Sequence, residues 1–178
     1  MFFLSICYCM LKKLVTLLIF LLSGTASALS IGDQAPDFSL PDQNGQTKTL
    51  KENLGKWVIL YFYPMDDTPG CTTEACSFRD ATDKILAKKA VVYGLSVDDV
   101  ESHKKFAEKY SLPFSLLADV EGIVAKSYNS LGEFLSWKVA LRNTYIIDPS
   151  GKVAKKYTGV DPSIHVQQVL QDLIKLQS

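Results

Sequence analysis

Residues 57–63 (WVILYFY) constrain the fold of this chain more than any other segment. They are aliphatic and aromatic throughout, without the alternation of polar and apolar residues that a half-exposed strand shows. Such a run is typical of a strand buried on both faces, as in the sheets of α/β proteins. A strand of this kind needs further layers of structure on both sides of its sheet. It ends at Pro64, because proline cannot continue a central strand.

From residue 29 onward the chain alternates strand patterns with helix patterns, an order typical of α/β domains. The Asn44-Gly45 pair, flanked by alternating residues, predicts a β-hairpin ahead of the buried strand. Further strands are predicted over 90–97, 112–117, 143–147 and 152–157, and helices over 68–87, 98–110, 120–128 and 163–176. We therefore expect one domain over 29–178, with a central mixed sheet flanked by helices.

Apolar side chains on the predicted helix 68–87 and in the segment 131–140 are expected to pack in the interior. On the first helix these are Phe78, Ile85 and Leu86, which recur at helical spacing. Phe134 and Trp137 lie in a segment without a clear pattern, and plain packing is expected for them rather than a place at a substrate entrance or partner surface.

Residues 1–28 have the pattern of a secretory signal sequence. Two lysines precede the apolar run 14–22, and Ala26-Ser27-Ala28 follows it, so we expect cleavage after Ala28. The mature protein is then exported to a periplasmic or equivalent compartment. Because residues 2–9 are also apolar, an uncleaved anchor is the alternative, and it is the only membrane association expected.

The charge balance argues against nucleic acid as a partner. The chain has 19 lysine and arginine residues against 19 aspartate and glutamate residues, without a basic stripe. No metal is expected, because the cysteines and histidines lack the spacing of a zinc site. His103 and His165 are expected to be packing or surface residues without a catalytic role.

Cysteine placement points to the chemistry. Two of the four cysteines lie in the expected leader, which leaves Cys71 and Cys76 for a compartment where thiols tend to be oxidised. Thr68 and Pro69 predict the N-cap and first residue of a helix, so Cys71 lies in its first turn. Unpaired backbone N–H groups and the helix dipole stabilise a thiolate there, and a thiolate is the nucleophilic and oxidisable form. A buried structural cysteine is the alternative.

The residues around Cys71 resemble the active-site pattern of the peroxiredoxin family, Pro64-x-x-x-Thr68-x-x-Cys71. Residues 68–76 (TPGCTTEAC) are similar to its bacterioferritin-comigratory-protein, or PrxQ-type, branch. Similar segments continue at 76–80, 94–98, 102–110, 112–114 and 142–148. The resemblance implies a thioredoxin-like fold and a thiol-dependent peroxidase that needs no cofactor, because sulfur performs the redox chemistry.

The resemblance also implies a role for each residue of the pattern. Cys71 would be the peroxidatic cysteine, Thr68 a hydrogen-bond donor to the sulfur or the peroxide, and Pro64 a shield of the pocket. Arg142 would supply a fixed guanidinium that favours the thiolate and polarises the peroxide. Glu74 resembles a position that pairs with this arginine. Without the resemblance, simpler roles also fit these residues. Thr68 fits an N-cap and Pro64 a strand terminator. Arg142 fits a solvated cation, and Glu74 a favourable charge at the start of a helix.

Cys76 follows five residues later on the same predicted helix, and the resemblance implies that it is the resolving cysteine. Five helical residues rise about 7.5 Å and turn roughly 140° beyond a full circle. A disulfide needs Cα atoms about 4.4–6.8 Å apart. We therefore expect the first turns of the helix to unwind when Cys71 is oxidised. If Cys76 is only a small core residue, an external thiol must resolve Cys71 instead.

The function expected from the sequence is reduction of hydrogen peroxide and organic hydroperoxides, with the Cys71–Cys76 disulfide recycled by a thioredoxin-like reductant. A second hypothesis is an exported thiol–disulfide oxidoreductase, although that activity normally uses Cys-x-x-Cys and position 74 is Glu. A third is a non-catalytic holdase with a structural disulfide. Because the family branch is often monomeric, a monomer is expected.

Overall fold

The computed structural model describes residues 28–178, so the expected leader lies outside the described residues apart from Ala28. The strands of the main sheet are β3 (Trp57–Phe62), β4 (Ala90–Ser96), β5 (Ser115–Ala118), β8 (Asn143–Ile147) and β9 (Val153–Thr158). Two smaller sheets pair β1 (Ser39–Pro41) with β2 (Thr47–Thr49), and β6 (Leu131–Phe134) with β7 (Trp137–Ala140). The helices are α2 (Pro69–Asp80), α3 (Thr82–Ala87), α4 (Val100–Tyr110), α5 (Ile123–Ser127) and α6 (His165–Leu176), with a 3-10 turn η1 (Lys51–Asn53).

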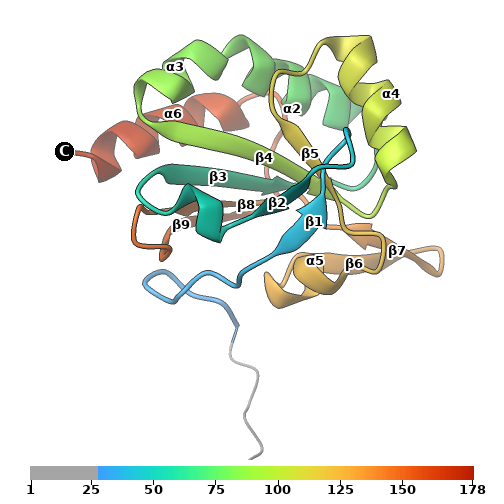
Figure 1. The fold of residues 1–178 in the computed structure, drawn as a ribbon, viewed down its shortest axis with the longest axis horizontal. Coiled ribbons are helices and arrows are strands. Elements are labelled where there is room, and N and C mark those ends of the chain that lie inside the picture. The colour runs from blue at the N-terminus through green and yellow to red at the C-terminus, as the bar shows by residue number, and fades with distance from the viewer. Residues whose placement is uncertain (1–27) are drawn as a thin grey trace, which may run out of the picture.

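The main sheet is mixed, as the sequence predicts, and its strand order is β5-β4-β3-β8-β9. The strands β3, β4 and β5 are parallel, whereas β8 runs antiparallel to both β3 and β9. Helices α2, α3, α4 and α6 cover one face, and α5 with the smaller sheets lies on the other (Figure 1). The predicted hairpin around Asn44-Gly45 is confirmed as β1–β2.

The buried strand β3 divides its side chains between two cores, because successive residues of a strand point to opposite faces. Ile59 and Tyr61 pack with the α2, α3, α4 and α6 side, and Val58, Leu60 and Phe62 pack with the α5 side. All five are at most 1% exposed, which explains why the sequence of this strand has no polar alternation. The prediction of a strand buried on both faces is confirmed.

The single helix predicted over 68–87 is wrong, because two helices, α2 and α3, meet at Ala81. The Ala81 N–H is shared between the carbonyls of Ser77 and Phe78, and the Thr82 hydroxyl also donates to the Phe78 carbonyl. A side chain that competes for a backbone carbonyl in this way loosens the regular helical pattern. The turn changes which residues of α3 face inward: Ile85 is buried, but Leu86 is 57% exposed, contrary to the prediction.

The segment 131–140, for which the sequence predicts only packing, forms the β6–β7 hairpin. Its turn residues Leu135 and Ser136 both have positive φ, 48° and 69°, the left-handed conformation that tight hairpin turns require. Phe134 and Trp137 flank this turn and are 66% and 76% exposed. The expectation that they pack in the interior is therefore wrong, because a two-stranded hairpin that projects from the domain has no layer to cover them.

The remaining predicted elements are present with shifted ends. The segments predicted as 112–117 and 120–128 are shorter in the structure, at β5 and α5. Among the residues that the structure describes, no helix is both long and apolar enough to cross a membrane.

Candidate active site

Cys71 lies in the first turn of α2, directly after the loop that follows β3. Pro69 occupies the first helical position, and Thr68 is the N-cap residue in an extended conformation, as the sequence predicts. The cysteine is free and only 1% exposed, with its side chain in the core shared by α2 and the sheet. The sulfur is therefore held at the positive end of a helix and away from bulk water, where a negative charge interacts strongly with nearby donors.

Arg142 reaches this sulfur from a distant part of the chain. Its Nη2 lies 3.1 Å from Cys71 Sγ, and its Nη1 donates to Glu74 Oε2 at 3.0 Å. The antiparallel register of β3 and β8, which pairs Tyr61 with Thr144, explains the approach. Because of this register, the residues just before β8 lie beside the end of β3, where α2 begins. The expected pairing of Arg142 with Glu74 is confirmed.

Gly70 makes room for the guanidinium. A Cβ atom at this position would lie 2.8 Å from Arg142 Nη2 and 3.6 Å from the Pro162 ring. A contact of that length forces one of the two groups to move. Glycine in the first turn of α2 therefore lets Arg142 pass close to the backbone and still touch Cys71.

Glu74 is buried behind the arginine, with no exposed surface. Burial raises the pKa of its carboxyl to about 7, and the charge and hydrogen bond of Arg142 oppose this rise. Its second oxygen, Oε1, has no hydrogen-bond partner among the described residues. The carboxyl orients the guanidinium through one oxygen, and its pKa lies close to neutral pH.

Thr68 and Pro64 lie in the loop between β3 and α2. The Thr68 hydroxyl donates to the Met65 carbonyl at 3.2 Å and makes no side-chain hydrogen bond to the start of α2. Thr68 is thus an N-cap by position without the side-chain cap that residues of its type often make. Pro64 directly follows β3 and is half-buried.

Cys76 lies five residues beyond Cys71 on the continuous helix α2, as predicted, and is half-buried and free. An intact helix holds the two Cα atoms too far apart, and on different sides, for a disulfide. The structure is therefore that of the reduced thiol pair.

A buried polar network beside this loop was missed by the sequence reasoning. The side chains of Asp66, Asp98 and His103 bring three potential metal-ligand atoms within 4.8 Å of one another. His103 has no exposed surface, and its Nδ1 lies 2.8 Å from Asp66 Oδ2. The only signal in the sequence was the place of His103 on the apolar face of a helix. His165 is also buried, against Thr144, and burial lowers its pKa to about 4.

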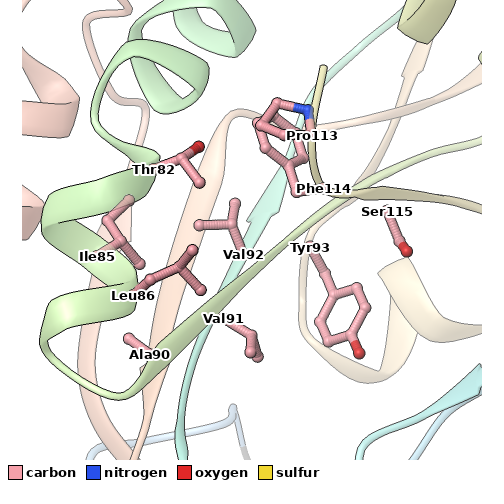
Figure 2. Close-up of a pocket in the computed structure, with 10 residues that line it drawn as sticks. All are labelled: Thr82, Ile85, Leu86, Ala90, Val91, Val92, Tyr93, Pro113, Phe114 and Ser115. Atoms are coloured by element: carbon pink, nitrogen blue, oxygen red, sulfur yellow. The ribbon is translucent and has the colours of Figure 1, made fainter. Parts of the chain in front are cut away.

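A groove elsewhere on the domain involves none of these residues. It has a volume of about 230 Å³ and lies between α3 and the strands β4 and β5 (Figure 2). In that view Ile85 and Leu86 come from α3 and face Val92 of β4. The exposed side of Leu86 therefore borders a groove rather than the core.

Comparisons with known proteins agree with the geometry around Cys71. The AhpC/TSA family matches residues 31–156 of this chain. The chain belongs to the AhpC/TSA family. It is 40% identical to peroxiredoxin Bcp of Bacillus subtilis over 155 residues, which cover 82% of this chain and 95% of that protein. It is 45% identical to chloroplastic peroxiredoxin Q of Arabidopsis thaliana over 143 residues, which cover 80% of this chain and 66% of that protein.

Solved structures of AhpC/TSA proteins have the same fold. A cysteine-to-serine mutant of PrxQ from Xylella fastidiosa matches with a TM-score of 0.81 at 29% identity, covering 85% of this chain and 99% of that one. Peroxidoxin BcpB of Mycobacterium tuberculosis matches with a TM-score of 0.79 at 35% identity, covering 84% and 99%. The thioredoxin-like peroxiredoxin fold is thereby confirmed, and so is the enzyme class: the protein is a thiol peroxidase. It acts on hydroperoxides with thioredoxin-type reductants, and these matches favour the peroxidase over the thiol–disulfide oxidoreductase and holdase hypotheses.

Replacing Gly70 by alanine should separate activity from stability. The added Cβ pushes the Arg142 guanidinium away from Cys71, so the second-order reaction with hydrogen peroxide should slow by about tenfold to a hundredfold in stopped-flow measurements. The thermal midpoint should stay close to that of the wild type, because the better helix propensity of alanine offsets part of the strain that the added Cβ places on Arg142. Thr73→Ala, at an exposed position of the same helix, should react like the wild type. A wild-type rate in Gly70→Ala would show that the arginine contact does not control the thiol.

The Glu74 carboxyl should make the stability of the fold depend on pH. Its pKa is about 7 in the folded protein against an ordinary value of 4.5, so the folded state holds the proton more tightly. The contribution of this carboxyl to the free energy of unfolding is complete below about pH 4.5 and is lost as the pH rises through 7. Relative to the parent, Glu74→Gln should therefore gain up to about 3 kcal/mol in unfolding free energy between these pH values.

Urea unfolding at several pH values measures this difference. Both proteins should carry Cys71→Ser, so that titration of the thiol cannot contribute. Parallel stability curves for the two proteins would contradict the role of Glu74.

Proposed function

We propose that Cys71 is the peroxidatic cysteine, and that its contact with Arg142 is the observation that carries this assignment. The sulfur is at the start of α2, within 3.1 Å of a guanidinium that stays protonated at any physiological pH. Both features favour the thiolate over the thiol. Thr68 and Pro64 complete the site in this proposal. The Thr68 hydroxyl turns from the Met65 carbonyl to donate to the peroxide, and Pro64 shields the sulfur from water.

The first step is a displacement at the O–O bond. The Cys71 thiolate attacks one peroxide oxygen, the O–O bond breaks, and the leaving oxygen departs as water or alcohol after taking up one proton. Cys71 becomes a sulfenic acid, so the sulfur is oxidised by two electrons and the peroxide is reduced by two. Arg142 faces the place where charge develops on the oxygens, and a donor fixed in advance needs no reorganisation during the reaction.

The second step forms a disulfide. The Cys76 thiol attacks the sulfur of the sulfenic acid, an S–S bond forms, and the hydroxyl leaves with a proton as water. Because intact α2 holds the two residues apart, the segment between them unwinds in this proposal. A thioredoxin-like dithiol then reduces the disulfide by thiol–disulfide exchange and is itself oxidised.

The substrates in this proposal are hydrogen peroxide and organic hydroperoxides. Support comes from a relative, the bacterioferritin comigratory protein of Xanthomonas campestris, which is described for its alkyl peroxide reduction activity and is 28% identical to this chain. Every residue in the site lies within this one chain, so a monomer is sufficient for the chemistry.

Stopped-flow oxidation with hydrogen peroxide, followed by mass spectrometry, tests the assignment of the two cysteines. Wild-type thiol should be lost far faster than free cysteine and end as a disulfide. Cys71→Ser should abolish the reaction, Arg142→Met should slow it by about a hundredfold, and Thr68→Val should slow it to a lesser degree.

Cys76→Ser is the matched control for the second step. It should keep the first step within about twofold and then accumulate sulfenic and sulfinic acid at Cys71. Full peroxidase activity in Cys71→Ser would overturn the assignment of the peroxidatic residue. Peroxidase turnover of the wild-type protein without formation of a Cys71–Cys76 disulfide would overturn the assignment of Cys76.

We further propose that the protein is exported and that the domain begins at Leu29. Leu29 is the first buried side chain of the described chain, and its carbonyl accepts a hydrogen bond from Lys156. A removable leader that ends at Ala28 fits this boundary. The N-terminal sequence of protein recovered from the extracytoplasmic fraction should begin at Leu29. Recovery of the protein in the cytoplasm, with residues 1–28 still attached, would refute export.

A further inference from the structure

The loop between β3 and α2 is fastened to helix α4 through two consecutive carboxylates. Asp66 is 8% exposed and receives hydrogen bonds from α4, and Asp67 is exposed and pairs with Lys109 at 2.6 Å. Both residues lie within five positions of Cys71. The loop that places Thr68 and Cys71 is therefore positioned by a helix that contributes no residue to the active site itself.

The Asp66 carboxylate accepts three hydrogen bonds from protein donors. Its Oδ1 accepts from the Tyr63 hydroxyl at 2.8 Å, and its Oδ2 accepts from Ser102 Oγ and from His103 Nδ1, each at 2.8 Å. Its backbone N–H donates to Asp98 Oδ2 at 2.9 Å. These bonds join the acidic and imidazole groups in one hydrogen-bond network.

Only one nitrogen of the His103 ring makes a hydrogen bond to Asp66. Because a carboxylate can only accept, Nδ1 carries the hydrogen toward Asp66. Nε2 is buried and has no hydrogen-bond partner among the described residues. A buried hydrogen bond to a charged acceptor is among the stronger contacts a protein makes.

Contacts at the other end of the reactive segment also involve α4. Arg79, near the end of α2, donates from Nη1 to the Tyr110 carbonyl at 2.9 Å. The neighbouring Phe78 has no exposed surface and stacks on Tyr61, with ring centroids 4.7 Å apart. The segment that contains Cys71 and Cys76 therefore lies between two anchored positions, Asp66 in the preceding loop and Phe78 near the end of α2.

We propose that the Asp66–His103 bond is a positioning contact that sets how readily the segment from Asp66 to Phe78 unwinds. The inference rests on the proposed function, in which Cys71 reacts in the folded helix and Cys76 reaches it only after unwinding. The contact therefore acts on the two steps in opposite directions. It favours the peroxide reaction by holding Thr68 and Cys71 in place, and it delays disulfide formation. A longer-lived sulfenic acid is more exposed to a second peroxide, which converts it to sulfinic acid.

His103→Leu removes the donor at similar side-chain volume and should shift both steps. The peroxide step should slow by about tenfold, disulfide formation should accelerate by about tenfold, and the sulfinic fraction per turnover should fall accordingly. His103→Asn keeps an N–H near the position of Nδ1 and should move all three quantities back toward the wild type. Stopped-flow fluorescence gives the two rates, and intact-protein mass spectrometry gives the sulfinic fraction.

Three further variants separate positioning from a general loss of stability. Val124→Ala, on the opposite face of the sheet, should lower the thermal midpoint and leave the sulfinic fraction unchanged. Lys109→Gln breaks only the exposed pair and should change the rates by about twofold or less. Ser102→Ala removes one bond to Asp66 and should shift the rates in the same directions as His103→Leu, so it serves if that variant does not fold.

An unchanged sulfinic fraction in both His103→Leu and Ser102→Ala, or the same change in Val124→Ala, would overturn the proposal. That result differs from failure of the proposed function, in which wild-type protein itself would form no Cys71–Cys76 disulfide.

Discussion

The contact between the Arg142 guanidinium and the Cys71 sulfur is the interaction on which the rest of the site depends. It joins the first turn of α2 to the residue before β8, two segments about seventy positions apart in the sequence. Glu74 fixes the guanidinium from behind, and Gly70 leaves the space through which it passes. A cation held in this way favours a charged sulfur before any substrate arrives, so little reorganisation is needed during the reaction.

This arrangement leaves polar groups near the sulfur buried without hydrogen-bond partners among the described residues. Glu74 is without solvent and has one oxygen unpaired, and the nearby Tyr61 hydroxyl is also buried without a partner among the described residues. Burial, followed by the charge of Glu74, raises the pKa of Tyr61 well above its ordinary value, so this ring stays neutral. Polar groups left unpaired in a core are rare, and they are more common at functional sites, where the surrounding fold holds them in place.

In the proposed cycle, helix α2 has to meet two opposing requirements. It must be folded for Cys71 to meet both the helix dipole and Arg142, and it must open for Cys76 to reach the oxidised sulfur. Regions that open locally are those with few buried contacts, and on this part of α2 Thr73 is exposed while Thr72, Cys76 and Ser77 are half-buried. In this proposal, the contacts of Phe78 and of the Asp66 loop confine such opening to the short segment between them.

The sequence by itself determined most of the helices and strands and the place of Cys71 at the start of a helix. The unbroken apolar run of β3 required a sheet covered on both faces, and Thr68-Pro69 marked the start of the helix that carries Cys71, because these signals are local. The family resemblance named Arg142 and Glu74 as groups near that sulfur, but only the tertiary structure gave their geometry, the burial of Glu74 and the Asp66–His103 bond. These contacts join residues dozens of positions apart, and spacing in the sequence does not specify them. The exposure of Leu86, Phe134 and Trp137 was likewise decided by which layers the folded chain provides to cover them.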